Sequence, residues 1–324
     1  MWSVGILQGL SRNVKSMEKG SITAIILTYN EEQHIERCVS SLRPFCKDIL
    51  VVDSFSTDRT IDLAQRMNVR IVKHEFVHQA QQFNWALEAC DIQTDWVWRV
   101  DADEYVSEEL GRKVVSTTAN CDEEVNGIYV NKKIIFQGGF LKHGGWYPAP
   151  QIKIIRKGFG ASENKVMDEH LIVFSGETIA IDGDQTDENL NDLTWWINKH
   201  NRYATREAIN MMRIEYNLSE SEEEVTPSLW GNDAERKRWL KNAYVRLPLF
   251  LRPILYFTAR YIILLGFLDG IPGLIWHVLQ GFWYRFLVDA KVYEIKKKYR
   301  FDKTEIKNFL KSNYKQATIS GTNE

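Results

Sequence analysis

The sequence has only four cysteines, Cys38, Cys46, Cys90 and Cys121, and no two of them form a CxxC pair. Their spacing matches no zinc motif, and scattered thiols in a chain of 324 residues indicate a reducing compartment. The sequence also has no excess of positive charge, because its 41 Lys and Arg residues are outnumbered by 43 Asp and Glu residues, which gives a net charge of −2. A dedicated nucleic-acid-binding protein is usually strongly basic, so we do not expect nucleic acid as a partner.

The sequence also lacks an apolar run long enough to cross a membrane. Near the N-terminus the apolar stretch 4–10 is too short for a signal peptide, and residues 1–20 are expected to be a weakly ordered leader. In the apolar C-terminal region, the longest charge-free run is 270–284. As a helix this run is about 22 Å long, short of the hydrocarbon core of about 30 Å. We therefore expect two helices, joined near 269–272, that lie in or dip into one leaflet.

Positive charges follow this apolar region and would meet anionic head groups: Lys291, Lys296, Lys297, Lys298 and Arg300. The alternative is that both helices are buried core and that the lysines lie on a solvated face. Both interpretations stay open from the sequence alone.

The first half of the chain alternates strand and helix patterns. Each strand is followed by a helical pattern, which predicts βαβ units and a parallel sheet with strands at 22–27, 49–52, 69–72 and 96–100. Asn30, with Gln33 three residues later, is expected to cap the first helix. Ligands of such sheets bind beyond the carboxyl ends of the strands, where Asp53 and Asp101 fall.

The second half of the chain does not continue the regular strand–helix alternation. Strands are predicted at 128–136 and 152–156 around a Gly- and aromatic-rich loop at 137–150, followed by a long helix at 193–216. We divide the chain into a leader (1–20), a catalytic domain (21–218), an acidic linker (219–232), a helical membrane-associating region (233–300) and a tail (301–324).

Two carboxylates at the end of the fourth strand carry the strongest chemical pattern. In an extended chain, Asp101 and Asp103 point to one side, so both can present oxygen ligands to one Mg²⁺ or Mn²⁺ that bridges a diphosphate. Surface acid pairs are common, and the position at the end of a strand is what favours a metal site. Asp53 can accept hydrogen bonds from a base or ribose, although it can equally well cap its own turn.

Four short motifs in this order resemble the family 2 glycosyltransferases with the GT-A fold. They are Thr28-Tyr29-Asn30-Glu31, Val52-Asp53-Ser54, Phe83-Asn84-Trp85-Ala86-Leu87 and Asp101-Ala102-Asp103-Glu104. The similarity is greatest to bacterial enzymes that build lipooligosaccharide core or exopolysaccharide. It implies a Rossmann-like α/β fold with a mostly parallel central sheet flanked by helices.

The resemblance also implies roles for individual residues. Asp53 would hold the uracil or ribose of a UDP-type donor, with Thr28, Tyr29, Glu31 and Asn84 in the same binding region. Asp103 would be the main metal ligand, and Asp101 would contact the ribose or the metal.

The catalytic base and the phosphate contacts fall later in the chain. The family places a carboxylate base where this sequence has Asp168-Glu169, and Glu169 is preferred over Asp168 without excluding it. Lys153 and Arg156 would contact the diphosphate, although Lys153 stands where arginine is more usual. An ordinary hairpin with a basic face is the alternative for this segment.

The resemblance leads to an expected activity. We expect an inverting transfer from a nucleotide-sugar to a lipid-linked glycan or core oligosaccharide, at the cytoplasmic face of a bacterial inner membrane. Two alternatives are a sugar nucleotidyltransferase and a catalytically idle scaffold at the membrane surface. The first normally carries a Gly-rich loop after its first strand, where this chain has Thr28-Tyr29-Asn30. The oligomeric state stays open.

Overall fold

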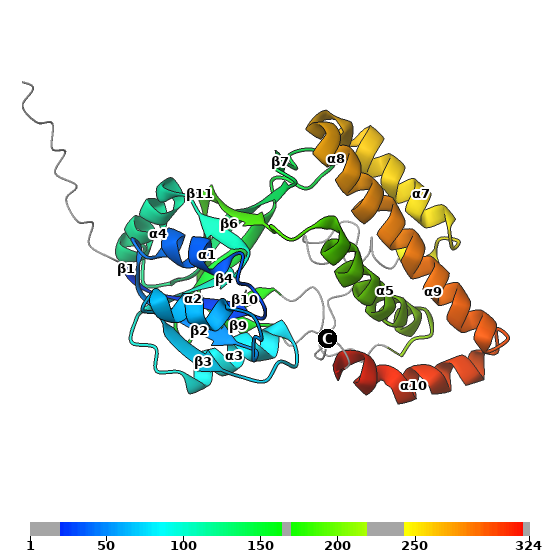
Figure 1. The fold of residues 1–324 in the computed structure, drawn as a ribbon, viewed down its shortest axis with the longest axis horizontal. Coiled ribbons are helices and arrows are strands. Elements are labelled where there is room, and N and C mark those ends of the chain that lie inside the picture. The colour runs from blue at the N-terminus through cyan, green and yellow to red at the C-terminus, as the bar shows by residue number, and fades with distance from the viewer. Residues whose placement is uncertain (1–19, 164–169, 219–242, 320–324) are drawn as a thin grey trace, which may run out of the picture.

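A computed structural model describes residues 20–163, 170–218 and 243–319 (Figure 1). Its centre is a mixed sheet with the strand order β3-β2-β1-β4-β8-β6-β11-β5, and β7 pairs with β6. The strands are β1 (Gly20–Thr28), β2 (Cys46–Asp53), β3 (Arg70–Lys73), β4 (Trp96–Asp101), β5 (Glu104–Val106), β6 (Val125–Phe136), β7 (Gly139–Phe140), β8 (Pro150–Arg156) and β11 (Glu177–Glu188). A separate pair is formed by β9 (Gly160–Ser162) and β10 (Leu171–Val173).

The first four strands are parallel, as the sequence predicts. In their register Thr28 pairs with Asp53 and Leu27 pairs with Asp101, so the carboxyl ends of β1, β2 and β4 meet at one edge. On the other side of β4 the direction changes, because β8 is antiparallel to both β4 and β6. Apolar runs on β1, β2 and β4 are buried because helices cover both faces of this part of the sheet.

The two faces carry different helices. Helices α1 (Ile35–Leu42), α2 (Thr60–Arg66) and α4 (Glu108–Asn120) pack on the face with Ala24 and Ile26. Helix α3 (Gln79–Ala89) packs through Phe83 and Ala86 on the face with Ile25 and Leu27. This alternation of faces along β1 is the expected consequence of the two-residue period of a strand.

The C-terminal part of the chain is helical. Within the described residues its helices include α5 (Leu193–Glu215), α7 (Leu251–Phe257), α8 (Gly270–Trp276), α9 (Tyr284–Lys298) and α10 (Lys303–Ile319). Two π-helical segments, η1 (Thr258–Ile263) and η3 (His277–Trp283), continue α7 and α8, and the short 3₁₀ helix η2 (Gly266–Asp269) makes the turn. The long helices α5 and α9 lie side by side, and α10 crosses their end (Figure 1).

Three local predictions differ from the structure. Asn30 and Gln33 do not form a capping box, because α1 begins only at Ile35 and Asn30 adopts a left-handed conformation with φ of 55°. Strand β11 was not predicted, since its alternating polar sequence carries no apolar run. The expected tail at 301–324 contains helix α10, whose Ile306 and Leu310 are buried.

Candidate active site

Polar side chains gather where β1 and β2 end. Asp53 is fully buried, and its carboxylate accepts hydrogen bonds from the Ser56 backbone N–H at 2.9 Å, from the Ser56 hydroxyl and from the Thr28 hydroxyl at 3.2 Å. These contacts close the turn after β2. The structure thus shows Asp53 in the turn-capping role, and its contact with a nucleotide stays a prediction.

The loop after β1 is fastened to the loop after β2. The Asn30 N–H donates to Ser56 Oγ at 2.9 Å, and Asn30 Oδ1 accepts from the Thr57 N–H at 2.8 Å. The Glu31 N–H donates to Thr60 Oγ1 at 2.7 Å. Tyr29 projects from this loop with 41% of its surface exposed. The two loops therefore form one rigid rim that presents Tyr29 and Glu31 at the carboxyl edge of the sheet.

Asp101 is the last residue of β4, and Asp103 follows it at the same edge. The Asp101 backbone N–H donates to Glu104 Oε2 at 2.9 Å, which folds the chain back into β5. Asn189, directly after β11, donates to Asp103 Oδ2 at 3.1 Å. Asp101 Oδ1 is buried and has no hydrogen-bond partner within the described ranges. A buried carboxylate oxygen without a donor is costly unless a ligand completes its contacts.

Glu104 is the buried anchor of this turn. It accepts from Lys153 Nζ at 2.8 and 3.0 Å and from Gln185 Nε2 at 2.5 Å, and Gln185 in turn accepts from the Trp98 indole at 2.8 Å. Lys153 is 6% exposed. The structure therefore ties Lys153 to Glu104, where it supports the turn that carries Asp101; its predicted diphosphate contact is untested.

The pKa values of Asp101 and Asp103 are shifted in opposite directions. Burial works to raise the pKa of Asp101, but Lys153, Arg99 and Lys132 outweigh it and lower that pKa. Burial raises the pKa of Asp103, with further contributions from Glu31 and Asp101, against the opposing charge of Lys199. Asp101 is thus held as an anion, whereas Asp103 gains most from a cation placed beside it.

Three residues near this edge were missed by sequence reasoning: His34, Asn189 and Lys199. His34 Nε2 accepts from the Leu190 N–H at 2.8 Å, so its Nδ1 carries the proton and donates to Glu31 at 2.6 Å. Lys199 comes from α5, where its ammonium lies 4.5 Å from the centre of the Trp195 ring. The spacing of Glu31 and His34 hints at this pair, but no motif marks Asn189 or Lys199.

Two predicted site residues use their side chains to hold other parts of the protein. Asn84 exchanges two hydrogen bonds with the backbone of Ser162, at 2.8 and 2.9 Å, so its amide holds β9 against α3. Arg156 pairs with Trp96 at the start of β4, roughly 17 Å along the strand from Asp101. Its guanidinium donates to the Val125 carbonyl and to Asn126. The expectation that Arg156 contacts the diphosphate is therefore corrected, because β8 runs antiparallel to β4.

The predicted base falls outside the described residues. Asp168 and Glu169 lie in the stretch 164–169, between β9 and β10. The hydrogen bonds of Asn84 to Ser162 fix the chain two residues before that stretch begins.

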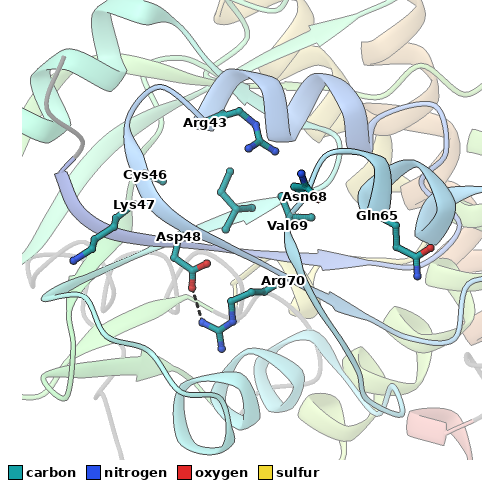
Figure 2. A pocket seen from close by; sticks show the side chains of 9 residues that line it. Arg43, Cys46, Lys47, Asp48, Gln65, Asn68, Val69 and Arg70 are labelled. Atoms are coloured by element: carbon teal, nitrogen blue, oxygen red, sulfur yellow. Dashed lines mark hydrogen bonds and ion pairs between the residues drawn. The ribbon is translucent and has the colours of Figure 1, made fainter. Parts of the chain in front are cut away.

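A cavity of about 400 Å³ lies at the opposite edge of the sheet, at the amino ends of β2 and β3 (Figure 2). Asp48 and Arg70 on its wall form an ion pair with each other at 2.5 Å. Because it lies at the amino ends of β2 and β3, remote from Asp101, this cavity is not part of the candidate active site.

The donor set at the carboxyl edge fits a divalent cation. Within the described residues no group of three or more His, Cys, Asp or Glu side chains forms a closed metal cage. Mg²⁺ and Mn²⁺ need no such cage, since they are commonly held by one or two carboxylates together with water and substrate phosphates. Asp101, with its unpartnered Oδ1, and Asp103 supply that number of carboxylates.

Comparisons with known proteins agree with this arrangement. The model of the family described as "Glycosyl transferase family 2" matches residues 23–159, which include most of β1, all of β2 to β8 and all of the edge from Thr28 to Asp103. The chain carries a glycosyl transferase family 2 domain. The enzyme class is therefore glycosyltransferase, and the fold predicted from the motifs is confirmed.

Curated relatives of this glycosyltransferase cover different shares of it. The lipopolysaccharide core biosynthesis glycosyltransferase LpsC of Rhizobium meliloti is 25% identical over 84% of this chain and 92% of its own length. An uncharacterised glycosyltransferase of Rickettsia typhi is 25% identical over 59% of this chain and 68% of its own length. One from Rickettsia bellii is 32% identical, but the match spans only 38% of that protein and 35% of this chain.

A solved structure, the mannosyltransferase PcManGT of Pyrobaculum calidifontis in complex with GDP-Man and Mn²⁺, is similar at a TM-score of 0.47. It is 14% identical, over 86% of this chain and 88% of the other.

Proposed function

We propose that this glycosyltransferase moves a sugar, with inversion, from a UDP-type nucleotide-sugar to a lipid-linked glycan or lipopolysaccharide-core oligosaccharide, and that it needs Mg²⁺ or Mn²⁺. The observation that carries the proposal is the pair Asp101 and Asp103 at the carboxyl edge, with Asp101 Oδ1 buried and unpartnered. The relation to LpsC along 84% of the chain supports an acceptor of the core-oligosaccharide kind.

Different residues at the carboxyl edge of the sheet would have different roles in the transfer. A divalent cation on Asp101 and Asp103 would neutralise the charge that develops on the leaving diphosphate. Lys199 adds a positive charge close enough to Asp103 to oppose the rise in its pKa. Glu31 and Tyr29 line the rim where the nucleoside would lie, with Glu31 oriented by His34.

The acceptor side needs a base. A carboxylate that takes the proton from the attacking hydroxyl typically contributes a factor of about 10² to 10⁴ in rate. Glu169 is our first choice and Asp168 our second. A base on the face opposite the leaving group gives inversion in one displacement. As part of the same proposal, we place the protein at the cytoplasmic face of a bacterial inner membrane.

The experiment is a screen of UDP-sugars for transfer-coupled UDP release with Mn²⁺, using the wild type and Asp103→Ala. We expect the wild type to release UDP from at least one donor. Asp103→Ala should lose this release, and added metal should not restore it. A wild type that binds UDP without turnover on any acceptor would favour the idle scaffold. Release of diphosphate from a nucleoside triphosphate and a sugar phosphate would instead favour a nucleotidyltransferase.

A further inference from the structure

The hairpin of α7–η1 and α8–η3–α9 ends in a tip, residues 258–274, whose surface is largely apolar. The tip lies at the far end of the hairpin from α10 (Figure 1). Ile263 and Ile271 are 71% and 67% exposed. Further exposed apolar side chains of the tip are Ile262, Leu264, Leu265, Phe267, Leu268 and Leu274. Large contiguous apolar patches of this kind mark interaction surfaces in proteins.

Between 251 and 284 the charged residues Arg252, Arg260 and Asp269 all make contacts within the protein. Arg252 is 2% exposed and pairs with Asp289. Arg260 donates to the carbonyls of Gly144 and Gly145, at 2.8 and 2.9 Å. Asp269, the only acid between 247 and 288, has a side chain that is 2% exposed and accepts from His143.

This arrangement reverses that of a water-facing helical hairpin, where charges point out and apolar side chains point in. The charges that interrupt the apolar run in the sequence therefore do not interrupt the apolar surface of the tip. Taken singly, none of the described helices is both long and apolar enough to cross a bilayer. The two arms 251–263 and 266–298, bent by 70°, meet those criteria only together.

Positive charges stand beside the tip. The loop that follows β7 is fastened to it: the Gly144 N–H donates to the Leu264 carbonyl at 2.8 Å, and the His143 N–H donates to Asp269 at 2.9 Å. That loop carries the exposed Lys142. Lys133 lies nearby on β6, with its ammonium 4.9 Å from the centre of the Phe140 ring. An apolar projection with lysines at its side is the arrangement that anionic head groups complement.

We propose that the tip 258–274 inserts into one leaflet of an anionic bilayer. Lys142 and Lys133 then lie at the level of the head groups, and the apolar side chains around Ile263 and Ile271 enter the acyl region. The surface is distinct from the sugar-transfer site, and the proposal needs neither donor nor metal.

Insertion of the tip also places a loop of the catalytic domain at the membrane. The packing between the two is close, because a Cβ atom added at Gly144 would lie 2.3 Å from Cε1 of His277. The Arg260 guanidinium also stacks on Trp146, 4.9 Å from the ring centre. Loop 141–149 therefore moves with the tip, and a lipid-linked acceptor would reach the enzyme beside this loop.

Flotation of the full chain with vesicles, without nucleotide or acceptor, tests the proposal. We expect binding to phosphatidylethanolamine–phosphatidylglycerol vesicles and much weaker binding to phosphatidylcholine vesicles. The variant Ile263→Asp/Ile271→Asp should partition at least about tenfold less, since two side chains lose their burial and two carboxylates enter an anionic surface.

Phe159→Asp/Phe174→Asp is the matched control, because both phenylalanines are exposed on the catalytic domain and neither is part of the hairpin. It should float like the wild type. Hydrogen exchange of the wild type adds a readout that needs no variant. Vesicles should slow the exchange of the amides of 258–274, and the exchange of helices α1 to α4 should be unchanged. Equal flotation of the tip variant and the control would overturn the proposal. So would a concentration-dependent dimer that the tip variant disperses while vesicle binding is absent.

Discussion

The substitution Glu104→Gln tests how the candidate site is held together. The Glu104 carboxylate is fully buried and lies 2.8 and 3.0 Å from the Lys153 ammonium, which is itself almost fully buried. A glutamine keeps the shape but leaves the ammonium without a counter-charge at that position. It also turns an NH₂ group toward one of three donors: Lys153, Gln185 or the Asp101 N–H.

The magnitude follows from the burial of the pair. Removal of one partner from a buried ion pair costs about 3–5 kcal/mol, because the remaining charge has no compensation. Lys132 lies 3.9 Å from the same carboxylate but keeps its own partner, Asp187, at 2.6 Å, so it adds little to the loss. We expect Glu104→Gln to lower the free energy of unfolding by an amount in that range.

Urea denaturation followed by circular dichroism measures the change. Glu108→Gln is the matched control, since Glu108 pairs with Arg112 on the exposed surface of α4 and its loss should cost under about 0.5 kcal/mol. The double variant Glu104→Gln/Lys153→Met should regain most of the stability, because it leaves no buried unpaired charge. Equal effects of Glu104→Gln and Glu108→Gln would refute the reasoning.

Three further predictions concern the base, the cation from α5 and acid stability. Glu169→Gln should lower kcat by about 10² to 10⁴-fold, and Asp168→Asn by less, in a transfer assay at saturating substrate; the reverse order would move the base to Asp168. Lys199→Met should weaken UDP binding by about tenfold in calorimetry, with partial recovery in Lys199→Arg; unchanged affinity would remove Lys199 from the diphosphate region. Burial lowers the pKa of His200, which stacks on Trp196, from 6.5 to about 4. Its neutral form therefore contributes stability above about pH 6.5 that is lost as the pH falls from 6.5 toward 4. His200→Phe should flatten the decline of Tm over that interval by an amount equivalent to about 2 kcal/mol, and an identical decline in wild type and variant would contradict this.

The sequence predicted the parts of the fold that rest on local patterns. Alternating apolar runs and helical stripes located β1 to β4 and their helices within a few residues, and the parallel register then placed Thr28, Asp53 and Asp101 at one edge. The carboxylates at strand ends needed no knowledge of distant contacts.

The remaining parts of the site depend on long-range contacts. Strand β11 pairs in parallel with β6 despite its polar sequence, and it delivers Asn189 to Asp103. Arg156 was misplaced because only the antiparallel pairing of β8 with β4 decides which edge it reaches. Asn30 does not cap a helix, because its side-chain oxygen accepts from the Thr57 N–H of the neighbouring loop. None of these pairings has a local sequence pattern.

Calorimetric titration of UDP with and without Mn²⁺ tests the central claim most directly, namely that Asp101 and Asp103 hold a cation and the phosphates it carries. The wild type should bind UDP more tightly with Mn²⁺, and Asp48→Asn, at the opposite edge of the sheet, should behave the same way. Asp103→Asn should lose the dependence on Mn²⁺ while its thermal stability stays close to that of the wild type. An Asp103→Asn protein that still gains affinity for UDP from Mn²⁺ would contradict the account.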